Sequence, residues 1–332
     1  MMNLRTRVLK ATLACTLTCT LGFIATFAAQ NRAAAQGFPE RPIQVYVGFP
    51  AGGGADIIAR FYTDRLQAIL KQPVLIQNRP GANGNIAAEA VARAKPDGYT
   101  LLAGPSAPMA GGQFLYANMP VDAMVDYAMV APLNELGFAL AVKKDSPLNS
   151  VKELTEFLKK KPKSLFASSN SMSMASSYLY LYQAGVKSEN TPYKATADAV
   201  RDLNAGDVDF MFVDGPFAVA QAHNGNLKLL AVTTTYRAPG AETVPTMHEA
   251  GFPDYAITGW FMMLAPAKTP APVIAKLNEA ITQISKTDEA KAFFGKVGSI
   301  PLVDTPEGAS KKLAEDRKQW GIIAKAGNIK PQ

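Results

Sequence analysis

The stretch that decides the fold is IQVYVGFPAGGGADIIAR, which runs from Ile43 to Arg60. In its first five residues, Ile43–Val47, β-branched side chains recur with a two-residue period, which predicts a β-strand. Three glycines, Gly52–Gly54, follow, and an amphipathic helical run begins near Asp56. Glycine lets the backbone turn sharply, and a helix start exposes N–H groups with a partial positive charge. The stretch therefore predicts either an anion-binding site or a tight turn that binds no ligand.

Strands and helices alternate along the rest of the chain. Short apolar or β-branched runs predict strands at residues 73–76, 99–103, 138–142, 165–167, 210–213, 227–232 and 258–264. Apolar residues at helical spacing predict helices at residues 59–70, 86–93, 150–160, 197–203, 272–285 and 307–325. This order indicates an α/β fold with mostly parallel sheets and a second α/β domain in the second half of the chain.

Three loops follow predicted strands in the first part of the chain, at residues 49–54, 80–85 and 104–108, and the third contains Ser106. The carboxyl ends of parallel strands meet at one edge of a sheet, where ligand-binding loops gather. We therefore expect these three loops to face one crevice.

The first 35 residues differ from the rest in composition. Arg5, Arg7 and Lys10 form a basic start, residues 11–29 are uncharged and largely apolar, and three alanines at 33–35 offer a cleavage site. That order predicts a secretory signal peptide that is removed after export. An uncleaved membrane anchor is the alternative, because the apolar run is long enough to span a bilayer.

Removal of this segment changes the global chemistry of the chain. The 332 residues include 34 basic and 27 acidic side chains, a net charge of +7, and both cysteines lie in the segment. The mature chain would keep 30 basic and 27 acidic residues, a net charge of +3, without disulfides or thiol chemistry. This mild positive charge suits small anions and gives little support to nucleic-acid binding.

Catalytic signatures are missing from the sequence. The chain has two histidines, His223 and His248, and neither lies in a metal-ligand spacing such as H-E-x-x-H. It contains neither a G-x-S-x-G nucleophile motif nor a phosphate-binding loop ending in G-K-[ST]. The sequence therefore predicts a binding protein without a cofactor or a metal, and an exported hydrolase is the weaker alternative.

Short motifs spread over nearly the whole mature chain point to a family. They are FPERPI at 38–43, FPAGGGAD at 49–56, NRPGANGN at 78–85, PDGYT at 96–100, SVKEL at 150–154, TPYK at 191–194, GDVD at 206–209, VPT at 244–246, EAG at 249–251 and LAP at 264–266. In these motifs and in their order, the chain resembles the periplasmic receptors of tripartite tricarboxylate transporters, the Bug family of solute-binding proteins.

The resemblance implies a type II-like periplasmic-binding-protein fold of two lobes, each a mostly parallel sheet flanked by helices, with two hinge crossings. It places lobe 1 at residues 36–137 plus 260–332 and lobe 2 at residues 138–259. Such proteins close like a hinge on the ligand. We therefore expect a periplasmic monomer, not inserted in the membrane after cleavage, that delivers a small carboxylate to the membrane subunits of a transporter. A sensor that presents its closed form to a signalling receptor has the same fold and stays an alternative.

The resemblance also implies which residues hold the ligand, mainly through backbone N–H groups and ordered waters. The first loop matches the family at Phe49, Gly52–Gly54 and Asp56. In lobe 2 the matching positions are Tyr193, Lys194 and Asp214. An acid that opens a helix is favoured by the helix dipole, so we expect Asp56 to order the loop rather than to contact the ligand. The full set of candidate ligand-binding residues is Phe49, Ala51, Gly52, Gly53, Gly54, Ala55, Asp56, Ser106, Ser168, Ser169, Ser173, Tyr193, Asp214 and Phe217.

One loop departs from the family. Where the family has a glycine-rich loop followed by His-Leu, this chain has SSNSMSM at 168–174 and then Tyr178-Leu179. We expect an apolar wall beside serine hydroxyls, formed by Met109, Met172, Met174, Phe49 and Phe217. Such a pocket suits a carboxylate with a sizeable apolar body, for example an aromatic dicarboxylate such as terephthalate. The alternative is that these methionines pack in the core of the second lobe.

Overall fold

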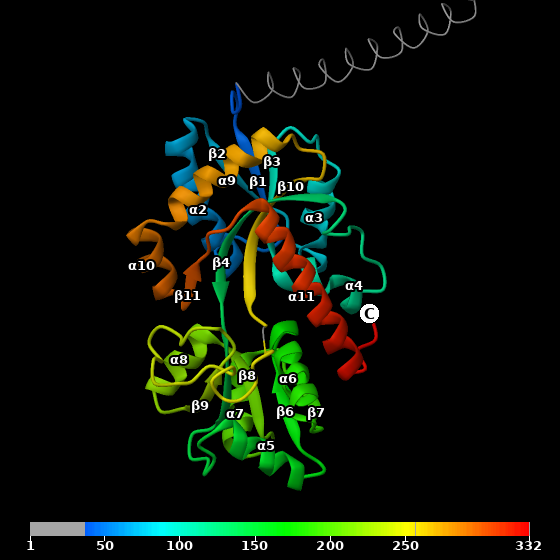
Figure 1. Ribbon diagram of the computed structural model, residues 1–332, viewed down its shortest axis with the longest axis vertical. Helices are drawn as coiled ribbons and strands as arrows, with labels where there is room; N and C mark the ends of the chain where they lie inside the picture. The colour runs from blue at the N-terminus through cyan, green and yellow to red at the C-terminus, as the bar shows by residue number, and fades with distance from the viewer. Residues whose placement is uncertain (1–36, 256, 332) are drawn as a thin grey trace, which may run out of the picture.

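The computed structural model describes residues 37–255 and 257–331, so the predicted signal peptide at 1–35 lies outside the described residues. Two β-sheets follow one another along the long axis of the molecule (Figure 1). The larger sheet, in the upper half of Figure 1, has the strand order β11-β4-β10-β3-β1-β2. Its strands are β1 (Ile43–Val47), β2 (Val74–Asn78), β3 (Thr100–Pro105), β4 (Tyr127–Leu136), β10 (Gly259–Pro266) and β11 (Ser299–Pro301).

The second sheet has the strand order β7-β6-β8-β5-β9. Its strands are β5 (Phe138–Lys143), β6 (Leu165–Ser168), β7 (Glu189–Pro192), β8 (Phe210–Asp214) and β9 (Leu227–Val232). Both sheets are mixed rather than mostly parallel. In the larger sheet β1 is parallel to β2 and β3, whereas β10 is antiparallel to β3 and β4. In the second sheet β6 is parallel to β7 and β8, whereas β5 is antiparallel to β8 and β9. The strands next to each crossing, β4, β5, β9 and β10, all take part in antiparallel pairs.

Helices flank both sheets, as the α/β pattern predicts (Figure 1). They are α2 (Gly54–Leu70), η1 (Ala82–Gly84), α3 (Asn85–Ala92), η2 (Ala107–Gly111), α4 (Gly112–Leu115), α5 (Val151–Lys160), α6 (Ser171–Ala184), α7 (Thr196–Ala205), α8 (Gly215–His223), α9 (Ala271–Ser285), α10 (Asp288–Lys296) and α11 (Pro306–Ala326). The cap of α5 follows its sequence signal, because the Ser150 hydroxyl accepts a hydrogen bond from the Glu153 N–H at 3.1 Å.

Apolar clusters fill the faces of the sheets. One cluster lies between the larger sheet and helices α2, α9 and α10, and it includes the fully buried Tyr62 and Phe294. A second cluster covers the other face of this sheet and extends into the second sheet, with Trp260, Trp320 and Tyr180 among its members. The two sheets therefore share one apolar core along α6 and α11, two helices that pack against each other.

The chain passes between the sheets twice, once around Gly137 with the adjoining ends of β4 and β5, and once along the connection from Thr233, after β9, into the first residues of β10. The two passages are hydrogen-bonded to each other. The Phe138 N–H donates to the Thr233 hydroxyl at 2.9 Å, and the Thr233 N–H donates to the Phe138 carbonyl at 2.8 Å. A Cβ atom at Gly137 would lie 2.7 Å from Cγ2 of Thr234. A larger residue than glycine would therefore push the two passages apart.

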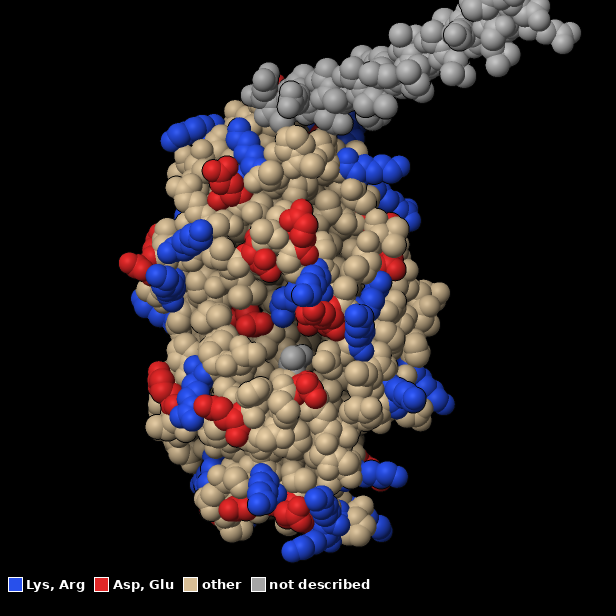
Figure 2. Space-filling view, in the orientation of Figure 1, with Lys and Arg blue, Asp and Glu red and all other residues tan. Residues whose placement is uncertain are grey.

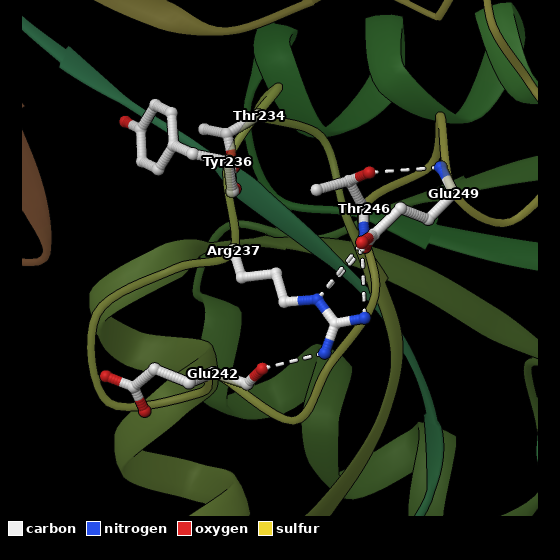
Figure 3. A network of polar contacts seen from close by, with 6 residues as sticks. All are labelled: Thr234, Tyr236, Arg237, Glu242, Thr246 and Glu249. Carbon is white, nitrogen blue, oxygen red and sulfur yellow. Dashed lines mark hydrogen bonds and ion pairs between the residues drawn. The ribbon is translucent and has the colours of Figure 1, made fainter.

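The second passage carries its own polar network (Figure 3). The Arg237 guanidinium forms a bidentate ion pair with the Glu249 carboxylate, in which Nε lies 3.1 Å from Oε2 and Nη2 lies 3.2 Å from Oε1. Arg237 Nη1 also donates to the Glu242 carbonyl at 3.0 Å. Glu249 and Thr246 exchange two further bonds, from the Thr246 N–H to the carboxylate and from the Glu249 N–H to the hydroxyl. These contacts hold a long connection that lies outside both sheets.

The loops after β1 and β2 pack backbone against backbone. A Cβ atom at Gly48 would lie 2.4 Å from Cα of Gly84 and 2.9 Å from its carbonyl oxygen. Gly84 itself has a φ of +93°, in the region that favours glycine. The close approach of these two loops therefore depends on glycine at both positions.

We predict that Gly48→Ala lowers the free energy of unfolding by roughly 1–3 kcal/mol, because its methyl group would overlap the Gly84 backbone. Gly54→Ala is the control in the same loop, since no atom lies within 4 Å of a Cβ built there. Urea denaturation measures both variants. Equal stability of the two variants would contradict the packing argument.

Candidate functional site

A cavity of about 250 Å³ lies between the two sheets. It brings together the loop after β1, the end of β3, the start of α6 and both passages between the sheets. Its walls are largely aromatic or apolar, and no charged side chain lines it. The lining residues are Phe49, Pro105, Ser106, Ala107, Pro108, Tyr116, Leu136, Phe138, Asn170, Ser171, Met172, Gly259, Trp260 and Phe261. We call it the inner cavity.

A second cavity of about 330 Å³ adjoins the first, because Tyr116, Asn170 and Ser171 line both. It lies over the ends of β6 and β7, and its walls are more polar. The other lining residues are Leu115, Ser168, Ser169, Met174, Asn190, Pro192, Tyr193, Ile329 and Lys330. We call it the outer cavity. The two cavities together form a cleft that runs from the passages between the sheets to the segment after α11.

The start of helix α6 forms the wall that the two cavities share. Asn170 caps the helix, and its Oδ1 accepts a hydrogen bond from the Ser173 N–H at 2.8 Å. The first-turn N–H groups of Ser171 and Met172 have no carbonyl one turn earlier within the helix. They are uncharged donors at the positive end of a helix dipole, in residues that line the inner cavity. The loop predicted at 168–174 is thus shorter than expected, because the Asn170 cap lets the helix begin at Ser171.

Ser106 connects three elements at the inner cavity. It is buried, and its Oγ accepts a hydrogen bond from the Trp260 N–H of β10 at 3.3 Å. The same oxygen lies 4.0 Å from the sulfur of Met172 in the first turn of α6. Ser106 therefore joins the end of β3 to one passage between the sheets and to the α6 terminus.

Three predicted residues, Ser168, Ser169 and Tyr193, line the outer cavity. Ser168 Oγ donates to Asn190 Oδ1 at 2.7 Å, and Tyr193 OH donates to Asp202 Oδ2 at 3.0 Å. Burial, together with the neighbouring Asp202 carboxylate, raises the pKa of Tyr193. The Ser169 hydroxyl lies 2.9 Å from that of Thr196. Their oxygens keep free lone pairs, so these hydroxyl groups line the cavity as oriented dipoles.

The glycine loop is held by Asp56 and lies beside the cleft. Of this loop only Phe49 lines the inner cavity, whereas residues 51–56 line neither cavity. Asp56 is buried, and its Oδ2 accepts hydrogen bonds from the Gly52 N–H at 2.9 Å and from Arg60 Nε at 2.7 Å. Its Oδ1 accepts a hydrogen bond from Asn78 at 2.9 Å. Burial alone would raise the pKa of Asp56, but these hydrogen bonds outweigh it and lower the pKa. The arrangement favours the loop-ordering role.

Four other predicted residues lie away from both cavities. Ser173 is fully buried and donates its hydroxyl proton to the Phe212 carbonyl at 2.5 Å. Asp214 caps α8, with its Oδ1 accepting a hydrogen bond from the Phe217 N–H at 3.3 Å. The Phe217 ring packs against the core of the second sheet. Met109 is buried and lines a separate cavity beside Arg317, so it forms no part of the expected methionine wall. Ser173, Asp214 and Phe217 thus point toward their own sheet or helix cap, and Met109 lines a different cavity.

Several residues that line the cleft were not predicted from the sequence. Asn170 carried a usable signal, because an Asn that precedes a helix by one position is a favoured cap. No sequence motif marks three other lining residues, and only the tertiary fold brings them to the cleft. They are Tyr116, Asn190 and Phe261. Lys330 lies more than a hundred residues along the chain from the other charged or polar groups of the outer cavity.

A cleft between two sheets that are joined by two passages, with mostly uncharged lining residues, is the geometry of a receptor that encloses a small solute. The model of the tripartite tricarboxylate transporter family receptor matches residues 58–329. Protein BugT of Bordetella pertussis is 32% identical over 310 residues, which cover 92% of this chain and 95% of that protein. A UPF0065 protein of Bordetella bronchiseptica is 34% identical over 302 residues, which cover 90% of this chain and 89% of that protein. The chain belongs to the tripartite tricarboxylate transporter receptor family.

Solved structures agree with this assignment. The R. palustris protein Rpa4515 with adipate superposes with a TM-score of 0.73 at 30% identity, covering 89% of this chain and 100% of that one. MatC from Rhodopseudomonas palustris with bound malate has a TM-score of 0.68 at 29% identity, covering 86% of this chain and 100% of that one. The family and these neighbours are substrate-binding proteins, so the protein is a solute-binding receptor and not an enzyme.

Two properties of the described residues bear on the class of site. Within residues 37–255 and 257–331, none of the helices has both the length and the apolar character needed to cross a bilayer. Over the same residues, no group of three or more histidine, cysteine or acidic side chains is placed to hold a metal ion.

We predict that Asp56→Ala lowers the free energy of unfolding by about 2 kcal/mol at neutral pH, because three donors lose a charged acceptor. The lowered pKa fixes the pH dependence. The contribution of Asp56 is complete above the ordinary carboxyl pKa of 3.8 and is lost as the pH falls through the lower folded value. Chemical denaturation across this range measures it. Asp64→Ala, an exposed change on the same helix, is the control and is expected to leave stability nearly unchanged. A flat difference between wild type and Asp56→Ala at all pH values would refute the role.

Asp214 gives the opposite pH dependence. Burial raises its pKa, although the Phe217 N–H works against this, so the folded state holds the proton more tightly than the unfolded state. The contribution of Asp214 to stability should therefore fall as the pH rises from 3.8 through the raised value. Asp214→Asn keeps the cap and removes this dependence, so it should gain stability relative to wild type at neutral pH. Asp207→Asn, an exposed change before β8, is the control. Parallel pH profiles of wild type and Asp214→Asn would count against the assignment.

Proposed function

We propose that the protein is a periplasmic receptor that captures a small carboxylate between the two sheets and delivers it to the membrane subunits of a tripartite tricarboxylate-type transporter. On this proposal the larger sheet is the centre of lobe 1, at residues 36–137 and 260–332, and the second sheet is the centre of lobe 2, at residues 138–259. The signal peptide directs export, and the mature receptor works as a monomer that is not inserted in the membrane.

The observation that carries the proposal is the chemistry of the cleft. The start of α6 supplies the first-turn N–H groups of Ser171 and Met172 to the shared wall, and no carboxylate lines either cavity. Phe49, Trp260 and Phe261 supply an apolar surface beside these donors. Such a site favours an anion that carries an apolar body. We propose that the carboxylate lies at the α6 terminus and that the body of the ligand lies against the aromatic side chains.

The glycine loop has a place in the same mechanism. The first-turn N–H groups of α2, at residues 54–56, have no carbonyl one turn earlier in that helix, and the glycines at 52 and 54 are exposed. We propose that closure of the two lobes brings this second helix terminus onto the ligand carboxylate. Two helix dipoles would then stabilise one anion from opposite sides. Gly137 and the paired passages at Phe138 and Thr233 are the proposed hinge.

The surface charge agrees with a small ligand. On the face that α11 crosses, acidic and basic side chains are interspersed without a large area of one sign (Figure 2). This pattern does not favour binding of a nucleic acid along that face.

The ligand class follows from the cleft and its relatives. Rpa4515 is described with adipate and MatC with malate, both small dicarboxylates. The aromatic side chains of the inner cavity favour a body larger and flatter than that of malate. We propose aliphatic or aromatic dicarboxylates of adipate or terephthalate size as the ligands.

Ser171→Pro tests the proposal at the first N–H group of α6. Proline is tolerated at the first position of a helix, so the change leaves the helix in place while it removes this N–H group together with the Ser171 hydroxyl. We predict that it weakens binding of adipate or terephthalate about tenfold in calorimetry, because a hydrogen bond to a charged oxygen is lost.

Asp288→Pro makes the same change at the first position of α10, away from both cavities, and is the matched control. It should bind like wild type. The proposal fails if wild type binds none of adipate, malate and terephthalate, or if the two proline variants bind equally well.

A further inference from the structure

The segment that follows α11 reaches across to the second sheet. Helix α11 packs on α6, and the Gly327 backbone lies so close to the Tyr178 ring that a Cβ atom there would be 2.6 Å from it. Ile329 lines the outer cavity and packs against the shared core. This segment, residues 327–330, is therefore part of the wall of the cleft.

The geometry of the helix end sets the direction of this segment. The Ile329 N–H donates to the Ala324 carbonyl at 2.9 Å, and the Asn328 N–H donates to the Lys325 carbonyl at 3.3 Å. Asn328 adopts a φ of +46°. These two bonds and the left-handed residue form a Schellman motif, which turns the chain sharply out of the helix. The turn places Lys330 at the outer cavity.

Lys330 is the single charged side chain among the described residues that line the two cavities. No ion pair or hydrogen bond of the described chain engages its ammonium group. It faces a cavity that Ser169, Asn190 and Tyr193 also line. An unpaired ammonium group beside neutral polar groups favours an anion from the ligand, since no carboxylate of the cavity wall competes for it.

We propose that Lys330 selects ligands with a second anionic group, which makes the receptor specific for dicarboxylates over monocarboxylates with the same body. This inference rests on the proposed function, in which one carboxylate lies at the α6 terminus. From the α6 terminus the body of the diacid extends past Tyr116, an aromatic residue that lines both cavities, and its far carboxylate meets Lys330 in the outer cavity. Specificity then depends on Lys330, which follows α11, and on its contact with a ligand that is held by the second sheet.

The test compares matched pairs of acids by calorimetry on the mature chain. Adipate and hexanoate differ by one carboxylate, as do terephthalate and benzoate. Wild type is expected to bind at least one diacid about tenfold more tightly than its monoacid. Lys330→Met should remove this difference, because it weakens binding of the diacid and leaves binding of the monoacid unchanged.

Two control variants separate charge from structure. Lys330→Arg keeps the positive charge and should retain the preference for the diacid. Lys325→Met removes an exposed lysine from the last turn of α11, outside both cavities, and should behave like wild type. The preference in wild type should also shrink as the salt concentration rises, because an exposed ammonium group is screened.

The outcomes distinguish this inference from the proposed function. Wild type that binds no diacid overturns both. Tight binding of diacids by wild type with the same preference in Lys330→Met overturns the role of Lys330 alone. If Lys330→Met weakens binding of the diacid and of the monoacid equally, the role of Lys330 is also overturned, since that pattern indicates a structural effect on the cleft.

Discussion

The cleft depends on the pairing of the two passages between the sheets. Phe138 and Thr233 exchange hydrogen bonds through one N–H each, and Gly137 leaves room for Thr234 beside it. Two strands that cross together can bend together, whereas separate crossings would let the sheets twist independently. Because both passages also line the inner cavity, through Leu136, Phe138 and residues 259–261, any bending there changes the shape of the cavity itself.

Charge is distributed so that the cleft stays free of carboxylates. Asp56 forms an ion pair with Arg60 and accepts hydrogen bonds from the neutral Gly52 N–H and the Asn78 amide. Asp214 caps α8. Asp202 accepts from Tyr193 behind the wall of the outer cavity. A buried cation would carry a large desolvation cost in the empty receptor, whereas helix N–H groups carry only partial charge. The proposed binding of an anion by backbone donors at α6 would avoid that cost, and Lys330, the one ammonium group among the described residues of the two cavities, lies at the solvent-exposed end.

Local patterns predicted the local structure well, and the site only in part. The strands Ile43–Val47 and Leu227–Val232 have the predicted bounds, since their periodicity is undisturbed. Strand β4 was missed because Pro132 and the buried Asn134 interrupt its apolar pattern. Phe49, Ser106, Ser168, Ser169 and Tyr193 do line the cleft, because strand ends place them there. Ser173 does not, since helical geometry turns a residue three positions after a cap toward the core. No local rule could place Lys330 there, because its position depends on how α11 packs on α6.

Helix α11 connects these features. In one turn Asp316 accepts a hydrogen bond from the Trp260 indole N–H of the second passage, and Lys312 lies 3.4 Å from Glu135 at the first. At its far end the same helix carries Lys330 to the outer cavity. Helix α11 therefore contacts the larger-sheet ends of both passages, where Trp260 and Glu135 lie opposite each other in β10 and β4, and it leads into one wall of the ligand site. A dianion bound between α6 and Lys330 would therefore favour the arrangement of the two sheets that keeps those groups in reach, and through α11 the same arrangement of the passages.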